Sequence, residues 1–140
     1  MVQFVDGCEN KKGYRRFKIN TLEKGKIDDY KAICEVVTRW YKRLMQENQP
    51  FPNLIIIDGG KGQLDFGIKA LYELRLYKKI PIISIAKREE EIYLENRIHP
   101  IKLDKKNPAL QLVQRIRDEA HRFAITYNKL LRKKEIRKKD

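Results

Sequence analysis

Two short apolar runs constrain this sequence more than any other feature. Residues 54–57 (LIII) and 80–86 (IPIISIA) contain hardly any polar side chain, a composition typical of strands that are buried on both faces of a sheet. Between them, over residues 63–76, apolar side chains recur at intervals of three and four residues, as on one face of a helix. The pattern predicts an α/β layer in which a crossover helix joins two buried strands.

The N-terminal segments predict that the sheet begins with antiparallel strands. Residues 1–6 form an apolar stretch that ends in Asp6-Gly7, which is the signature of a strand followed by a turn. Side chains alternate in character over residues 13–20, and this alternation predicts the return strand of a hairpin. The connection between the two strands is expected around residues 8–12.

Helices and a second hairpin complete the predicted order. Helical spacing begins at Asp28-Asp29, where an N-cap would stand, and residues 49–52 (QPFP) end this helix because proline disfavours helical geometry in the residue before it. Residues 91–103 predict a hairpin, and residues 108–131 predict a long helix capped by Asn107. The resulting order, β-β-α-β-α-β-(ββ)-α, indicates a mixed α/β architecture.

Charge is the strongest compositional signal. The 140 residues include 32 Lys and Arg against 19 Asp and Glu, a net charge of +13, while 41% of the chain is apolar. A folded domain with this excess favours a polyanionic partner, most often nucleic acid. Residues 129–140 contain seven Lys and Arg against two Asp and Glu, yet the remainder is basic as well. We expect one domain over residues 1–128 and a basic helix end or tail over residues 129–140.

Cysteine usage and hydropathy exclude two other classes. Cys8 and Cys34 are far apart and fit no Cys-x-x-Cys spacing, so reduced thiols in a cytoplasmic protein are expected. The chain shows no signal-peptide pattern and no apolar run of 18 residues, which argues against insertion into a membrane.

The first candidate site is Asp58, in the stretch NLIIIDGGKGQLDF of residues 53–66. Ligands of open α/β sheets gather beyond the carboxyl ends of the strands, and Asp58 directly follows such a strand. Three interpretations stand: a turn residue that caps the next helix, a phosphate-binding loop, or a carboxylate that holds a metal ion. The Walker pattern GxxxxGK[ST] is absent, which disfavours the phosphate loop.

A second candidate lies on the long C-terminal helix. Gln114, Arg117 and His121 are spaced by three and four residues, so they form one polar stripe beside the apolar face. A boundary histidine without a catalytic role explains His121 equally well on spacing alone. His99 lacks such neighbours and is expected on the hairpin surface. Glu119 and Arg122 are expected to form an ordinary surface ion pair.

Carboxylates, one histidine and a basic surface together suggest metal-assisted hydrolysis of a phosphodiester. Oxygen ligands suit Mg²⁺ or Mn²⁺, which polarise a phosphoryl group, and a histidine nearby would bind the ion or orient the attacking water. Basic side chains would hold the DNA backbone. The candidates for this role are Arg15, Arg16, Lys18, Lys61, Lys87, Arg88 and Arg117.

Several stretches resemble one family in their order and separation. They are GYRRFKI, DDYKAICEVVTRWY, NLIIIDGGKGQL, IISIAKREEEIY and PALQLVQRIRDEAHRFAITYNKLLRKK. Together they cover nearly the whole chain and resemble the C-terminal endonuclease domain of the UvrC family of bacterial nucleotide excision repair. The resemblance implies an RNase H-like α/β fold, a mixed β-sheet flanked by α-helices, that cuts damaged double-stranded DNA on the 5′ side of the lesion.

The resemblance also implies roles for individual residues. The catalytic positions of the family fall on Asp29, Asp58 and His121, of which Asp58 and His121 would bind Mg²⁺ or Mn²⁺, with Gln114 as a supporting residue. The family works with UvrB, through regions outside this chain, in the bacterial cytoplasm and at the nucleoid during repair.

The sequence departs from the family pattern in one respect. The first strand of the family carries a Phe-Asp-Ile-Ser-His-like segment with a central metal-binding aspartate, and residues 1–6 match the strand that follows it. We therefore expect an incomplete domain with weak or no activity of its own. A non-catalytic DNA-binding fragment is the alternative function, and a nucleotide-binding enzyme that uses Gly59–Gly62 is the third.

Overall fold

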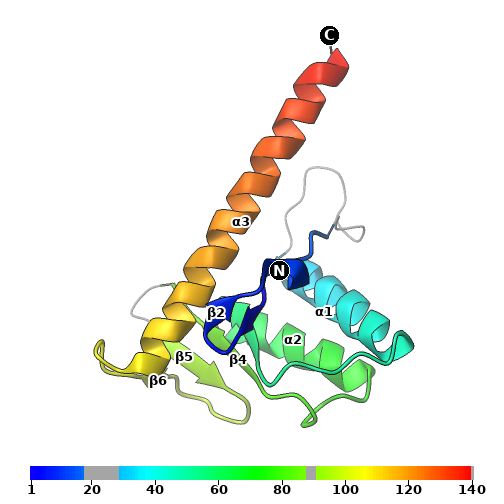
Figure 1. The fold of residues 1–140 in the computed structure, drawn as a ribbon. Helices are drawn as coiled ribbons and strands as arrows, with labels where there is room; N and C mark the ends of the chain where they lie inside the picture. Colours follow the sequence, from blue (N-terminus) through cyan, green and yellow to red (C-terminus); the bar gives the residue numbers. More distant parts are fainter. Residues whose placement is uncertain (18–28, 88–90, 140) are drawn as a thin grey trace. The chain divides into compact units, whose positions relative to one another are not determined.

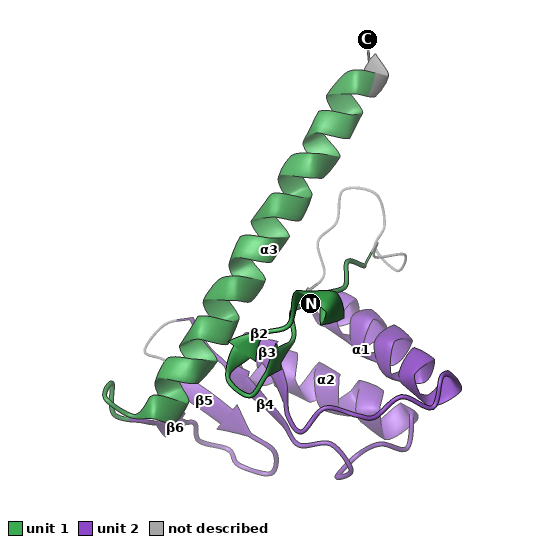
Figure 2. Cartoon of the chain, in the orientation of Figure 1, with its two compact units in different colours: residues 1–17, 104–140 green, residues 18–103 purple. Residues whose placement is uncertain are grey.

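The structure, a computed structural model, describes residues 1–17, 29–87 and 91–139 (Figure 1). The chain divides into two compact units (Figure 2). The larger is Lys18–Leu103, and the smaller combines Met1–Phe17 with Asp104–Asp140. Each unit is described by itself below.

A four-stranded mixed sheet forms the centre of the larger unit. Its strands are β3 (Ile55–Asp58), β4 (Ile82–Ile85), β5 (Glu91–Leu94) and β6 (Ile101–Lys102), in that spatial order. β3 and β4 are parallel, whereas β4, β5 and β6 pair antiparallel. The mixed α/β sheet predicted from the sequence is therefore confirmed. The apolar runs form the parallel pair, although Leu54 is exposed and Ile56 is half-buried rather than enclosed on both faces.

Two helices cover this sheet. α2 (Lys61–Glu73) crosses over between β3 and β4 and packs on both, and α1 (Asp29–Gln46) lies beside α2 (Figure 1). Gly67 lies at the closest approach of α2 to the strands, since a Cβ there would stand 3.0 Å from Ile82 Cδ1. The residues that share this core are Val37, Tyr41, Leu44, Ile55, Ile57, Leu64, Ala70, Leu71, Leu76, Ile80 and Ile82.

The N-terminal hairpin of the smaller unit is shorter than predicted. β1 (Phe4–Val5) pairs with β2 (Cys8–Glu9) across a tight turn at Asp6-Gly7, where both residues have positive φ. No return strand is assigned in the described part of residues 13–20, although Arg15 exchanges two backbone hydrogen bonds with Met1, at 3.1 and 3.0 Å. Lys11–Gly13 form a 3₁₀ turn instead, and residues 18–20 lie outside the described part. Asp6 and Gly7 turn the chain directly from β1 into β2, so the longer connection predicted around residues 8–12 does not form.

α3 (Pro108–Lys139) begins where the sequence predicts, because Asn107 Oδ1 accepts a hydrogen bond from the Ala109 N–H at 2.9 Å. It continues beyond residue 131, where the predicted helix ends, and Leu130 and Leu131 are exposed. The helix runs without a break across residue 129, so the boundary between domain and tail stays a prediction. No helix in the described ranges combines the length and the apolarity that crossing a bilayer requires.

Candidate functional site

Asp58 ends β3 at the carboxyl edge of the sheet. Its partner in the parallel register is Ile85, the last residue of β4. The next residue, Gly59, donates its backbone N–H to the Ile85 carbonyl at 3.0 Å, and the chain leaves the sheet there. The Asp58 side chain is exposed. The register of the strands therefore places a carboxylate at the edge where ligands of α/β sheets bind.

The glycine loop after Asp58 is held from two sides. The Gly60 N–H donates to Gln63 Oε1 at 3.0 Å, and the buried Ser84 hydroxyl donates to the Gly60 carbonyl at 3.2 Å. Gly59 has a φ of +150°, and a Cβ there would stand 2.6 Å from Gln63 Cγ, so only glycine fits without displacing Gln63. The N-cap of α2 is Gly60. This position disfavours the interpretation of Asp58 as the cap of that helix.

Two predicted DNA-binding lysines follow the same edge of the sheet. Lys61 is the first residue of α2, three residues after Asp58, and Lys87 comes two residues after β4. Both are exposed. Lys18 and Arg88, which we also predicted to contact DNA, lie outside the described residues. The other predicted catalytic residue of this unit, Asp29, is the first residue of α1.

The polar stripe on α3 exists as predicted. Gln114 and Arg117 are half-buried and His121 is exposed. Arg117 Nε lies 3.6 Å from Asp118 Oδ1, while its Nη1 is buried and makes no hydrogen bond to the residues described. A buried guanidinium N–H without an acceptor is costly, so an anionic group at this position would be favourable.

The predicted catalytic residues belong to different units. Asp29 and Asp58 lie in the larger unit and His121 in the smaller one, and their convergence on one metal ion stays a prediction. Within the described ranges, no three His, Cys, Asp or Glu side chains are grouped so that they could hold a metal ion.

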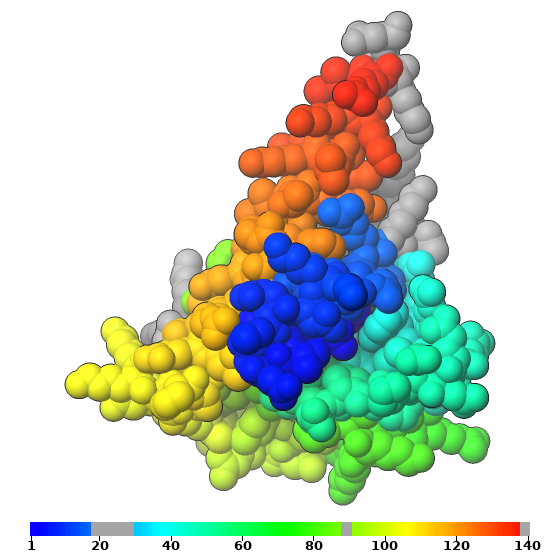
Figure 3. Space-filling view, viewed as in Figure 1, coloured from blue at the N-terminus to red at the C-terminus, as the bar shows by residue number. Residues whose placement is uncertain are grey.

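One feature of the smaller unit was not anticipated: aromatic rings of α3 clamp Arg16. The Arg16 guanidinium carbon lies 5.0 Å from the centre of the Phe123 ring and 5.4 Å from that of Tyr127. Tyr14 packs edge-on against Phe123, with ring centres 5.1 Å apart. The space-filling view shows the N-terminal residues, in blue, against the orange middle of α3 (Figure 3). Phe123 and Tyr127 are four residues apart, a spacing that predicts neighbouring positions on one face of a helix. No sequence pattern indicated that they would contact Arg16.

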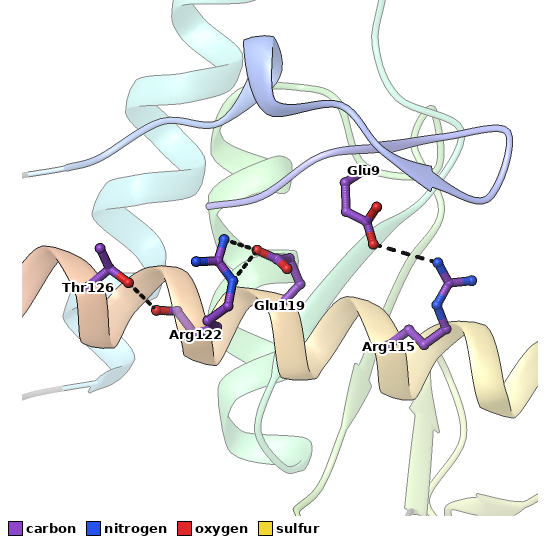
Figure 4. A network of polar contacts seen from close by, with 5 residues as sticks. All are labelled: Glu9, Arg115, Glu119, Arg122 and Thr126. Atoms are coloured by element: carbon purple, nitrogen blue, oxygen red, sulfur yellow. Dashed lines mark hydrogen bonds and ion pairs between the residues drawn. The ribbon is translucent and has the colours of Figure 1, made fainter.

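The pair Glu119–Arg122 is more than an ordinary surface pair (Figure 4). The Glu119 side chain is only 16% exposed, and its Oε1 accepts hydrogen bonds from Arg122 Nε, at 2.8 Å, and from Nη2. The Arg122 hydrogen bond lowers the pKa of Glu119. Burial of the Tyr14 hydroxyl, together with the negative charge of Glu119, raises the pKa of Tyr14. The predicted pair is therefore present with Arg122 exposed, and the N-terminal segment that packs over this turn of α3 partly covers Glu119.

Replacing Glu119 by glutamine should weaken the response of stability to acid. A carboxyl whose pKa is lowered by folding stabilises the fold above its unfolded pKa, and this contribution is lost as the pH falls through the folded pKa. The free energy of unfolding, measured with urea between pH 7 and pH 3, should therefore fall less steeply below about pH 5 in Glu119→Gln than in the wild type. Glu135→Gln, farther along α3 on an exposed side chain, is the control and should leave the slope unchanged. An identical slope in Glu119→Gln would contradict the interpretation.

Known proteins are similar to this chain over nearly its whole length. The UvrC RNAse H endonuclease domain matches residues 1–125 of the chain. UvrABC system protein C of Methanospirillum hungatei is 57% identical over 137 residues, which are 98% of this chain and 26% of the relative. The protein of the same name from Salinibacter ruber is 48% identical over 134 residues, 96% of this chain and 21% of the relative. The chain thus spans about a quarter of the length of these relatives. The resemblance of the sequence motifs is confirmed, and the chain belongs to the UvrC RNAse H endonuclease domain family.

Proposed function

We propose that this chain is the part of a DNA repair excision nuclease that cuts one strand of damaged double-stranded DNA on the 5′ side of the lesion, with Mg²⁺ or Mn²⁺ as cofactor. Membership of an endonuclease family and a net charge of +13 support DNA as the substrate. The observation that carries the proposal is the Asp58 carboxylate at the carboxyl edge of β3, with Lys61 and Lys87 following the same edge.

The residues at this edge supply part of the ligand set that a hard divalent cation needs. Asp58 offers carboxylate oxygens, the ligands that Mg²⁺ and Mn²⁺ prefer, and Gly59 and Gly60 add no side chains around it. Asp58 alone is not a complete site, and the described residues contain no group of three ligands. We propose Asp29 and His121 as the further members of the site. A bound ion would polarise the phosphoryl group and favour ionisation of the attacking water.

The side chains of the chain itself have separate tasks in this proposal. Lys61 and Lys87 would hold the DNA strand by its phosphates near Asp58, and Arg117 would bind a phosphate through the exposed part of its guanidinium group. His121 would orient the attacking water or bind the ion. Gln114 would support His121 from the same stripe of α3. In a larger assembly, UvrB would deliver the damaged DNA in the cytoplasm.

A DNA-binding role without catalysis is the second candidate, because no complete ligand group appears among the described residues. The two functions make different predictions for one experiment, a nicking assay on damaged duplex with Mn²⁺. Catalysis requires strand cutting that depends on Asp58. Pure binding requires salt-dependent association that Asp58→Asn and His121→Ala leave unchanged.

Arg16 should contribute to DNA binding through its guanidinium edge. The rings of Phe123 and Tyr127 hold the faces of the guanidinium and so orient its N–H groups in advance. Arg16→Ala should weaken duplex binding, measured by fluorescence anisotropy, and reduce the slope of log K against log salt by about one. Arg16→Lys should keep the slope but lose affinity, because an ammonium cannot stack as a plane. An unchanged slope in Arg16→Ala would contradict a phosphate contact.

A further inference from the structure

A second surface of the larger unit has no role in the proposal above. It lies at the end of α2 and in the turn that follows, and it surrounds depressions of about 560 and 520 Å³ to which Tyr72 and Tyr77 both contribute. We call it the tyrosine surface and define it by Lys69, Tyr72, Arg75, Tyr77, Lys78 and Lys79. We propose that the tyrosine surface binds a single-stranded segment of DNA by stacking unpaired bases on its rings.

Tyr72 presents the more exposed ring of the two, while Tyr77 is half-buried. Tyr72 is 69% exposed, although it directly follows the fully buried Leu71. Its ring centre lies 5.9 Å from that of Tyr77, at an angle of 57° between the planes. Rings tilted in this way do not cover one another's faces. A large aromatic side chain that is left in water beside a depression is typical of a binding surface rather than of a core.

The turn that carries the rings is rigid. The Leu76 N–H donates to the Leu71 carbonyl at 2.8 Å, and the Arg75 N–H donates to the Tyr72 carbonyl at 3.0 Å. Leu71 and Leu76 are buried, at 0% and 4% exposure, so the hydrophobic core anchors both ends of this turn. Arg75 has a φ of 61°, a strained value that persists only where the surroundings impose it. The backbone that carries the rings is therefore fixed before any ligand binds.

The charges around the rings favour a nucleic acid over a peptide. Four cationic side chains, all exposed, belong to the surface. Lys69 and Arg75 line the depressions together with two anions, Asp65 and Glu73, and Lys78 and Lys79 beside them supply the excess of positive charge. Lys78 Nζ lies 5.7 Å from the centre of the Tyr77 ring. Aromatic faces among cations match a strand that offers both bases and phosphates. A duplex hides its base faces, so the ligand must be unpaired.

The tyrosine surface is separate from the edge with Asp58. Tyr72 follows Lys61 by eleven positions on α2, which corresponds to about 16 Å along the helix axis. The inference rests on the proposed function only in taking DNA as the polymer that the chain contacts. Because the test measures binding alone, it would still support or contradict this inference if the catalytic proposal failed.

The experiment compares the affinity of the full chain for fluorescent dT₁₂ with its affinity for a duplex of similar length. Tyr72→Ala should weaken binding of dT₁₂ about tenfold, since one stacked base contributes about 1.4 kcal/mol or more, and should change duplex binding by less than about twofold. Tyr72→Phe keeps the ring and should bind as the wild type does. Lys42→Ala, an exposed lysine on α1, is the charge control for Lys78→Ala and should weaken dT₁₂ binding less.

Three outcomes would overturn the proposal. Equal affinities of Tyr72→Ala and Tyr72→Phe for dT₁₂ would exclude stacking. An equal loss for dT₁₂ and duplex would show that the effect does not depend on unpaired bases, and thermal unfolding of the variant would show whether it arises from loss of folding. Sedimentation that shows a wild-type dimer and a monomeric Tyr72→Ala variant, with unchanged dT₁₂ affinity, would assign the surface to contacts between copies of the chain.

Discussion

Assayed within the excision nuclease of which we propose this chain is a part, Asp58→Asn should reduce Mn²⁺-dependent nicking of damaged duplex DNA by about a thousandfold, equivalent to about 4 kcal/mol of transition-state stabilisation. Asparagine has nearly the shape of aspartate but lacks the negative charge that would hold a divalent cation. The surrounding structure should be preserved, because the loop is held by contacts of Gly59 and Gly60 rather than by Asp58 as a cap. The initial rate of strand cutting, at saturating Mn²⁺ and DNA, is the measurement.

Asp65→Asn is the matched control, since Asp65 is an exposed carboxylate on α2 in the same unit. It should cut at the wild-type rate. Calorimetric titration with Mn²⁺ gives a second readout, in which Asp58→Asn should bind more weakly and Asp65→Asn should not. Undiminished cutting by Asp58→Asn would refute the metal role of Asp58. Duplex binding without any cutting, indifferent to Asp58→Asn, would establish the DNA-binding alternative.

Leu71→Ala should destabilise the larger unit by about 3 kcal/mol. Leu71 is fully buried in the core that α1, α2 and the parallel strands share, so its removal loses apolar contacts and leaves a cavity. Urea unfolding followed by circular dichroism gives the free energy.

The neighbouring residue provides the control for Leu71. Tyr72→Ala removes a larger side chain, but one that is 69% exposed, and it should change the free energy of unfolding by less than about 0.5 kcal/mol. Similar losses in the two variants would mean that Tyr72 packs into the core, and its availability to a ligand would then be refuted together with the burial pattern.

The sequence predicted those elements that depend on interactions between residues close together in the chain. β3, β4 and the start of α3 were predictable because apolar runs and an Asn-Pro cap act over a few residues. Asp58 was predicted at the sheet edge because it directly follows one of these apolar runs. The N-terminal hairpin closes earlier than predicted, because Asp6-Gly7 turns the chain directly into β2. The predicted return segment still contacts the start of the chain, through the backbone hydrogen bonds between Arg15 and Met1.

The features of the candidate sites that the sequence did not predict depend on contacts between segments that are far apart in the sequence. The ion pair of Glu119 with Arg122 was predictable from their spacing, but the partial cover of Glu119 by the N-terminal segment was not. The rings that hold Arg16 lie more than a hundred residues away from it in the sequence. Tyr72 is off the apolar stripe of α2, and helical spacing alone cannot distinguish a solvated tyrosine from one at a binding surface.

If DNA binds as we propose, the length of α3 corresponds to a defined length of duplex. From His121 to its end at Lys139 the helix rises by about 27 Å, which corresponds to about eight base pairs of B-form duplex. Its exposed cations beyond His121 include Lys129, Arg132, Lys133, Lys134 and Arg137. A duplex that follows this helix would be held by its phosphates several base pairs away from any bond cut near His121. Hydroxyl-radical footprinting should then show protection that extends about eight base pairs to one side of the incision, and shortening α3 should shorten the footprint in proportion.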